Sequence, residues 1–107
     1  MSGDALGHVI YEVNLDVDAA VATDYRGWLD AHVQDMLALP GFVSAQVFEV
    51  AEPVEAGRVV YCVHYRLRDA AALDAYLREY AARMRADGAA RFGDRFRASR
   101  RVLHVAS

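Results

Sequence analysis

The stretch RVVYCVHYRL, residues 58–67, alternates residue by residue between an apolar face and a more polar face. The apolar face carries Val59, Tyr61, Val63, Tyr65 and Leu67, and the other face carries Cys62, His64 and Arg66. A period of two is typical of a β-strand buried on one side. A similar run at residues 42–50 precedes it, and a turn-rich segment at residues 52–57 joins the two runs. Together they predict a β-hairpin with a longer loop.

Two further strands are predicted outside this hairpin. Residues 8–15 alternate in the same way and predict a first strand. Residues 95–105 predict a last strand, but its apolar residues fall on both faces. This irregularity indicates either a β-bulge or a contact with another subunit.

Two helices are predicted between the strands, because apolar residues there recur at three- and four-residue intervals. Asp18 is the predicted N-cap of the first helix and Pro40-Gly41 its stop. Asp69 is the predicted N-cap of the second helix, and Gly88 its end or a break, before a short turn at residues 89–92.

The resulting order, β-α-β-β-α-β, predicts a ferredoxin-like α+β fold. Right-handed crossovers on this order give a four-stranded antiparallel sheet with two helices on one face. We expect one domain over residues 1–107, with a flexible start at residues 1–7.

Charge is distributed unevenly along the chain, although the formal net charge is only −3. Residues 1–57 sum to −9 and residues 58–107 to +6. In the ferredoxin-like order the first strand lies between the third and the fourth, so acidic and basic segments become neighbours in the sheet. We therefore expect charge pairing within the sheet and between subunits, and no nucleic-acid partner. The RNA-recognition module shares this order, but here Tyr61 and Tyr65 are expected to face the helices.

The residue composition argues against several kinds of chemistry. All twelve basic residues are arginine, and the absence of lysine excludes Schiff-base catalysis and a P-loop. The single cysteine, Cys62, excludes an internal disulfide, and the four histidines lack the short paired spacings of zinc ligands. We expect no metal and no cofactor.

The sequence shows neither a signal-peptide pattern nor a membrane-spanning run, so we expect a cytoplasmic protein with no membrane partner.

The sheet face opposite the helices is neither a typical core nor a typical solvated surface. It is expected to carry Ile10, Glu12, Asn14, Ser44, Gln46, Phe48, Cys62, His64 and Arg66. Such a mixture is typical of a subunit interface with satisfied polar groups. It favours a homodimer in which two sheets pack face to face, a dimeric α+β barrel. The alternative is a monomer with a solvated sheet.

The first helix carries the sharpest candidate site. Trp28, His32 and Asp35 have i, i+4, i+7 spacing and so lie along one edge of the helix. His32 is a candidate catalytic base, and Asp35 can orient its imidazole or raise its pKa. Trp28 can form the wall of an apolar pocket. The alternative is that Trp28 is a core residue and His32 a hydrogen-bonded structural histidine.

Other residues are predicted to complete a ligand-binding pocket. Tyr11, Tyr61 and Tyr65 are expected on the sheet wall that faces the helices. Arg91 and Phe92, near the end of the second helix, are expected to close its mouth, where the planar guanidinium of Arg91 can bind a carboxylate or phosphate. The alternative for Arg91 is an ordinary surface ion pair.

Several motifs resemble those of a family of short bacterial proteins catalogued as a domain of unknown function. They are Trp28-Leu29-x-x-His32-Val33-x-x-Met36-Leu37, Pro40-Gly41-Phe42, Tyr61-Cys62-Val63-His64-Tyr65, Leu73-x-x-Tyr76-Leu77 and Arg91-Phe92-Gly93. The resemblance covers nearly the whole chain and implies the ferredoxin-like fold of the wider dimeric α+β barrel group, with no established activity. The chain departs from the family pattern at Gln34, where proline is common, and at His64, where glutamine is more usual.

The resemblance and the residues leave three functions open. The first is a homodimer that binds a small apolar or aromatic molecule between helices and sheet. The second is a cofactor-independent monooxygenase or isomerase with His32 as base. Some relatives of this architecture oxidise aromatic substrates with asparagine, tryptophan and histidine, but Asn14 is expected on the face away from Trp28 and His32. The third is a structural or partner-binding dimer without a ligand.

Overall fold

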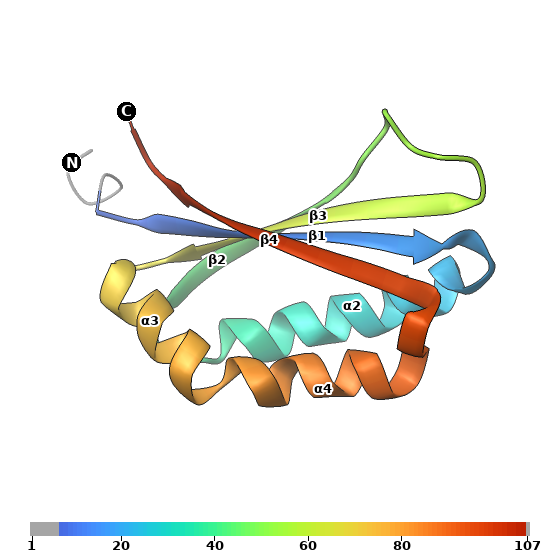
Figure 1. Cartoon of the computed structure of the whole chain (residues 1–107). Helices are drawn as coiled ribbons and strands as arrows, with labels where there is room; N and C mark the ends of the chain where they lie inside the picture. The colour runs from blue at the N-terminus through green and yellow to red at the C-terminus, as the bar shows by residue number, and fades with distance from the viewer. Residues whose placement is uncertain (1–6, 107) are drawn as a thin grey trace.

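The computed structural model describes residues 7–106, which form a four-stranded antiparallel sheet with all helices on one face (Figure 1). The strand order is β2-β3-β1-β4. The strands are β1 (Val9–Asp18), β2 (Phe42–Glu49), β3 (Arg58–Leu67) and β4 (Phe96–His104). The expected ferredoxin-like fold is therefore confirmed. Most of the expected flexible start lies outside the described residues.

Asp18 and Asp69 begin the two helical segments as expected. The Asp18 carboxylate accepts a hydrogen bond from the Ala20 amide and caps a 3₁₀ turn, η1 (Ala19–Val21), which leads into α2 (Ala22–Leu37). The Asp69 carboxylate accepts one from the Ala72 amide and caps α3 (Ala70–Glu79). Each cap satisfies a backbone donor that the first helical turn leaves without a partner.

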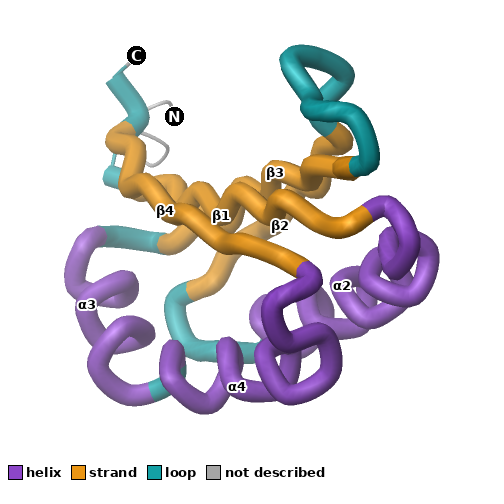
Figure 2. The backbone as a smooth tube through the Cα atoms, turned by 45° about the vertical axis from the view of Figure 1, so that its right-hand side comes forward, coloured by secondary structure: helices purple, strands orange, loops and turns teal. Residues whose placement is uncertain are grey.

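The second helical segment differs from its prediction. It breaks at Tyr80 into α3 and α4 (Ala81–Phe92), and η2 (Gly93–Arg95) follows before β4. Figure 2 shows the change of direction between α3 and α4. Gly88 neither ends nor breaks the helix, and no separate turn forms at residues 89–92. The apolar spacing continues through Tyr80, so the sequence pattern gives no sign of the break.

Gly88 is explained by packing. A Cβ atom at this position would lie 2.8 Å from Cη2 of Trp28, closer than side chains tolerate. The absence of a side chain thus lets α4 approach the indole ring of α2 directly.

The core lies between the sheet and the helices. Its fully buried side chains include Val17, Tyr25, Leu29, Met36, Val63 and Leu67. The predicted inward face of the sheet is confirmed, because Tyr11, Tyr61 and Tyr65 are each no more than 5% exposed. None of the helices within residues 7–106 is both long and apolar enough to cross a membrane.

The last strand is regular, contrary to one of its two predicted explanations. β4 pairs with β1 from Phe96 to His104 without a register shift, and the irregularity in the sheet lies instead on β2, between Phe42 and Ser44. Pairing with β1 thus sets which β4 residues face the helices, although apolar residues occur on both faces.

The expected mixing of charge within the sheet is confirmed. Carboxylates of β1 pair with arginines from both neighbouring strands and from the turn before β4. Asp16 contacts Arg58 at 2.7 Å and Arg97 at 3.3 Å, and Asp18 contacts Arg95 at 2.9 Å. The two oppositely charged parts of the sequence therefore neutralise each other in the fold.

Candidate functional site

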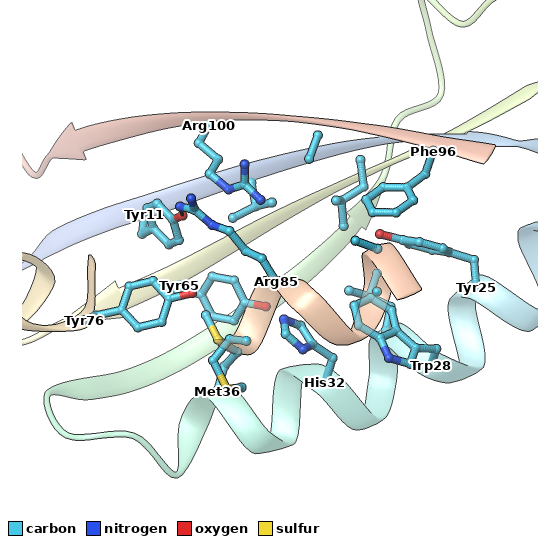
Figure 3. Close-up of a pocket in the computed structure, with 17 residues that line it drawn as sticks. Tyr11, Tyr25, Trp28, His32, Met36, Tyr65, Tyr76, Arg85, Phe96 and Arg100 are labelled. Carbon is cyan, nitrogen blue, oxygen red and sulfur yellow. Dashed lines mark hydrogen bonds between the residues drawn. The ribbon is translucent and has the colours of Figure 1, made fainter. Parts of the chain in front are cut away.

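A cavity of about 280 Å³ lies between the sheet and the helices (Figure 3). Most of its lining is aromatic or aliphatic. The residues that line it are Tyr11, Val13, Leu15, Tyr25, Trp28, Leu29, His32, Met36, Tyr65, Tyr76, Met84, Arg85, Gly88, Ala89, Phe96, Ala98 and Arg100. An apolar cavity with a few converging polar groups is the usual form of a small-molecule site.

Four of the predicted site residues meet at this cavity. Trp28 and His32 reach it from α2, and Tyr11 and Tyr65 reach it from the central strands β1 and β3. In Figure 3 the imidazole of His32 points from α2 into the cavity, toward the sheet. The spacing of these residues in the sequence therefore predicted the helix wall and the sheet wall of the cavity. The role of each residue remains a prediction.

The predicted pocket residue Tyr61 and the predicted orienter Asp35 lie elsewhere. The Tyr61 ring packs beneath the guanidinium of Arg26, whose Cζ lies 5.5 Å from the ring centroid. Asp35 is exposed and does not line the cavity, and no hydrogen bond joins it to His32 within residues 7–106. The two side chains are neighbours on the helix surface, but Asp35 lies on its solvent-exposed edge.

The predicted mouth residues Arg91 and Phe92 also lie outside this cavity, because α4 continues past Gly88 and carries them beyond it. The Phe92 ring is partly buried against the core, and its centroid lies 4.8 Å from the ring centroid of Tyr25. Arg91 forms a surface ion pair with Asp87 at 3.3 Å. The ion pair was the alternative interpretation of Arg91.

His32 lies half-buried in the cavity wall. Its ring stacks on Trp28 with a centroid distance of 4.6 Å and an interplanar angle of 18°. Burial lowers the pKa of His32 below its usual 6.5, although the nearby carboxylates of Asp35 and Asp87 oppose this effect. The imidazole is therefore largely neutral at pH 7 and has a nitrogen available to accept a proton.

Trp28 is held in place from the second helical segment. Its Nε1 atom donates a 2.7 Å hydrogen bond to the Asp87 carboxylate, and this bond lowers the pKa of Asp87. Asp87 also accepts a hydrogen bond from Arg91. The indole is thereby held against Gly88, and the His32 ring stacks on it.

Tyr25 is a buried polar residue that was not among the predicted site residues. It is fully buried, and its hydroxyl has no hydrogen-bond partner within the part of the chain that the structure describes. Burial raises the pKa of this phenol well above its usual range. In Figure 3 the hydroxyl points into the cavity near Phe96. A buried donor without a partner is unusual, and a bound molecule could satisfy it.

Arg85 and Arg100 were also missed as site residues. Arg85 reaches the cavity from α4 and donates a 2.7 Å hydrogen bond to the hydroxyl of Tyr11, and Arg100 reaches it from β4. Burial raises the pKa of Tyr76 to about 12, with a smaller contribution from Tyr11, whereas both arginines act to lower it. Arg100 follows Phe96 at an even spacing and so lies on the same face of β4. The sequence did not show this position, because it depends on the register of β4 against β1.

A second polar cluster lies on the open face of the sheet. Potential ligand atoms of Glu12, Cys62 and His64 all lie within 4.8 Å of one another. The Glu12 carboxylate already accepts hydrogen bonds from Asn14 and Arg101, and one oxygen lies 2.9 Å from His64 Nε2. A metal ion would have to displace Arg101, so we interpret the cluster as an ion-pair network.

Solved structures with the same fold span nearly the whole chain. A conserved protein from Methanosarcina mazei has a TM-score of 0.73 at 10% identity, covering 97% of this chain and 98% of its own. A variant of SnoaB, a cofactor-independent oxygenase from Streptomyces nogalater, has a TM-score of 0.64 at 15% identity, covering 94% and 95%. Rv0793 from Mycobacterium tuberculosis has a TM-score of 0.63 at 21% identity, covering 94% and 96%. At these identities the similarity establishes the fold alone.

No protein of curated function matches the chain significantly. The model of the family described as "Domain of unknown function (DUF4286)" matches residues 8–106. This match confirms the resemblance seen in the motifs. Since it covers nearly the whole chain, the protein belongs to this family.

Proposed function

We propose that the protein binds a small aromatic molecule in the cavity between its helices and sheet. The observation that carries the proposal is the cavity itself, an apolar space of about 280 Å³ into which a few polar groups converge. Small-molecule pockets usually have about 300 Å³ or more, so this one fits a ligand of one or two rings.

The walls favour a planar ligand. The stacked pair of Trp28 and His32 lines one side, and Tyr11 and Tyr65, with ring centroids 6.3 Å apart, line the sheet side. Aromatic walls contact a flat ring over a large area and favour offset or edge-on packing. The hydroxyl of Tyr25 adds a buried polar group that a ligand oxygen can satisfy.

Isothermal titration calorimetry and thermal shift with 2-naphthol and 2-naphthoic acid test this proposal. We expect binding of at least one probe, lost in Ala89→Phe because Ala89 lines the cavity. Ala90→Phe is the matched control, since Ala90 is exposed on the same helix outside the lining. Equal effects of the two substitutions, or no binding by the unmodified protein, would contradict the proposal and favour a dimer without a ligand.

A second candidate function is cofactor-independent oxygenation. It is favoured by a neutral imidazole in the aromatic cavity and by the fold shared with SnoaB. His32 would remove a proton from a phenol or enol, and the resulting anion would react with O₂ at an activated CH₂ carbon. One oxygen atom would become the product carbonyl and the other would leave in water, so the two C–H bonds of the CH₂ carbon supply all four electrons that reduce O₂.

Oxygen uptake with 2-tetralone, a bicyclic ketone with an activated CH₂ group, tests the second candidate. We expect turnover to disappear in His32→Ala and to persist in Cys62→Ala, because Cys62 lies on the opposite face of the sheet. Turnover that survives in His32→Ala would exclude His32 as the base.

The protein would act as a homodimer that pairs through the open sheet face. Half-buried Ile10 and Cys62 and 40%-exposed Phe48 lie on that face, around the satisfied Glu12 network. A mixed patch of this kind is typical of a subunit interface. A cytoplasmic location also remains part of the proposal, to be tested by cell fractionation.

A further inference from the structure

We propose that the cavity selects aromatic carboxylates, and that Arg85 and Arg100 clamp the carboxylate group. This inference rests on the proposed function, because it specifies the class of aromatic ligand that the cavity binds. It follows from the charges, the geometry and the hydrogen-bond donors at one end of the cavity.

The charge of the lining is entirely positive. Arg85 and Arg100 are its two arginines, and no aspartate or glutamate of residues 7–106 lines the cavity. Both arginines are exposed residues, so they stand at a solvent-facing end of the cavity with N–H donors that can bind an anion.

Most arginines of the chain are paired with carboxylates. The protein has more carboxylates than arginines, and eight of its twelve arginines form ion pairs within residues 7–106. Arg85 and Arg100 form none with any carboxylate in that range. Acidic side chains are thus abundant elsewhere and absent where these two guanidinium groups meet the cavity.

The two arginines approach from opposite layers. Arg85 comes from α4 and Arg100 from β4, and both extend toward the end of the cavity where Tyr11 and Tyr76 lie (Figure 3). A guanidinium presents five N–H donors in a planar fork that matches the two oxygens of a carboxylate. Arg85 uses one of these donors on Tyr11 and keeps others for a ligand.

The neighbouring tyrosines add neutral donors. The Tyr11 oxygen accepts a hydrogen bond from Arg85, so its own hydrogen is available to a carboxylate. Burial keeps the pKa of Tyr65 and Tyr76 high, and both phenols therefore remain protonated donors at neutral pH. This end of the cavity offers donors and positive charge, which suits an anion and not a cation.

The opposite end predicts a second feature of the ligand. The unpartnered hydroxyl of Tyr25 lies with Trp28 and Phe96, and rings surround it there. A ligand with a hydroxyl or carbonyl on the side away from its carboxylate would satisfy both ends at once. A hydroxyaryl carboxylate such as 6-hydroxy-2-naphthoate has this pattern.

Calorimetric titration with 6-hydroxy-2-naphthoate and with neutral 2-naphthol tests the inference. We expect the carboxylate to bind the unmodified protein at least about tenfold more tightly, as for a charge-assisted bidentate contact. The double variant Arg85→Gln/Arg100→Gln should lose this preference and bind both probes alike. Arg83→Gln is the control, because Arg83 lies on α4 but packs over the Tyr80 ring and does not line the cavity.

The possible failures are distinguishable. If 2-naphthol binds as tightly as the carboxylate, or if the double variant keeps the preference, the arginine clamp is wrong and the aromatic site stands. If neither probe binds the unmodified protein, both the clamp and the proposed function fail. Circular dichroism of the double variant ensures that a lost preference is not due to unfolding.

Discussion

At the scale of single residues, His32 is the group whose ionisation is most closely tied to the cavity. Its folded-state pKa lies below 6.5 because burial disfavours the charged ring more than Asp35 and Asp87 favour it. The unfolded chain therefore binds a proton more readily than the folded one. Stability is fully present above pH 6.5 and falls as the pH drops from 6.5 toward the folded-state pKa.

We predict that His32→Phe removes this loss, because phenylalanine keeps a ring against Trp28 but cannot take up a proton. Chemical denaturation from pH 5 to pH 8 measures the effect. His104→Phe, at the exposed end of β4, controls for the loss of a histidine away from the cavity. The same slope in His32→Phe as in the wild type would mean that His32 is not the group responsible.

Gly88 is a second residue at which the structure predicts the effect of a substitution on stability. In Gly88→Ala the new methyl group must displace the Trp28 ring, which Asp87 and His32 hold in place. We predict that the free energy of unfolding falls by about 1 kcal/mol or more, as for overpacking of a core, although alanine favours helices. Gly27→Ala is the matched control.

Gly27 lies on α2, and its added Cβ would meet no atom within 4 Å. The Gly27→Ala variant should therefore have a free energy of unfolding about 0.5–1 kcal/mol higher, because the substitution lowers the entropy of the unfolded chain. Urea denaturation of both variants checks the difference. A stabilised Gly88→Ala would show that the indole moves aside freely and that the cavity wall is not rigid.

At the scale of elements, the pairing of β1 with β4 is fixed by charge as well as by the backbone ladder. The Glu12 side chain is only 6% exposed, and its two oxygens accept hydrogen bonds from Arg101 at 2.7 and 3.1 Å. These bonds, supported by Asn14 and His64, lower the pKa of Glu12 to about 2, although burial opposes the shift.

We predict that Glu12→Gln destabilises the protein by about 1.5–3 kcal/mol at pH 7, the usual range for hydrogen bonds to a charged group. Since the folded-state pKa is depressed from 4.5, this contribution is present above pH 4.5 and lost as the pH falls toward 2. Denaturation of both proteins at pH 7 and pH 2.5 measures it. A stability difference that persists unchanged at pH 2.5 would contradict the ionic origin, and Glu49→Gln, exposed on β2, controls for loss of charge.

The elements that the sequence predicted well are those with one uninterrupted pattern. Residues 58–67 alternate throughout, and β3 has these bounds in the structure. The break at Tyr80 could not be predicted, because no glycine or proline marks it and the apolar spacing passes through it. Leu77, one of the apolar residues of this segment, is 43% exposed.

The candidate site was predicted in part for the same reason. The spacing of Trp28 and His32 is local to one helix and can be read directly from the sequence. Arg100 depends on the register of β4 against β1, and Arg85 on the path of α4 after the break at Tyr80. Both positions depend on how distant parts of the chain pack together, so the sequence did not predict that these two arginines line the cavity.

At the scale of the whole molecule, the helices cover one face of the sheet and leave the other open (Figure 1). The β2–β3 loop rises on the open side in both Figure 1 and Figure 2, beside the face that carries Phe48 and Cys62. The Phe48 ring lies edge-on to His64 at 5.3 Å, which extends an apolar surface toward the Glu12 network. A second copy of the same face would bury this surface and leave the cavity on the far side of each sheet accessible.

We therefore predict that the protein is a dimer in solution and that Phe48→Arg converts it to a monomer, because the new charge would be buried at the interface without a partner. Leu77→Arg is a matched control, since Leu77 is similarly exposed, 43% against 40%, but lies on the helical side. Size-exclusion chromatography with light scattering measures the mass of each. A monomeric wild type, or equal dissociation by the two substitutions, would exclude pairing through the open sheet, whereas a Phe48→Arg monomer that still binds 2-naphthol would show that each cavity is complete within one chain.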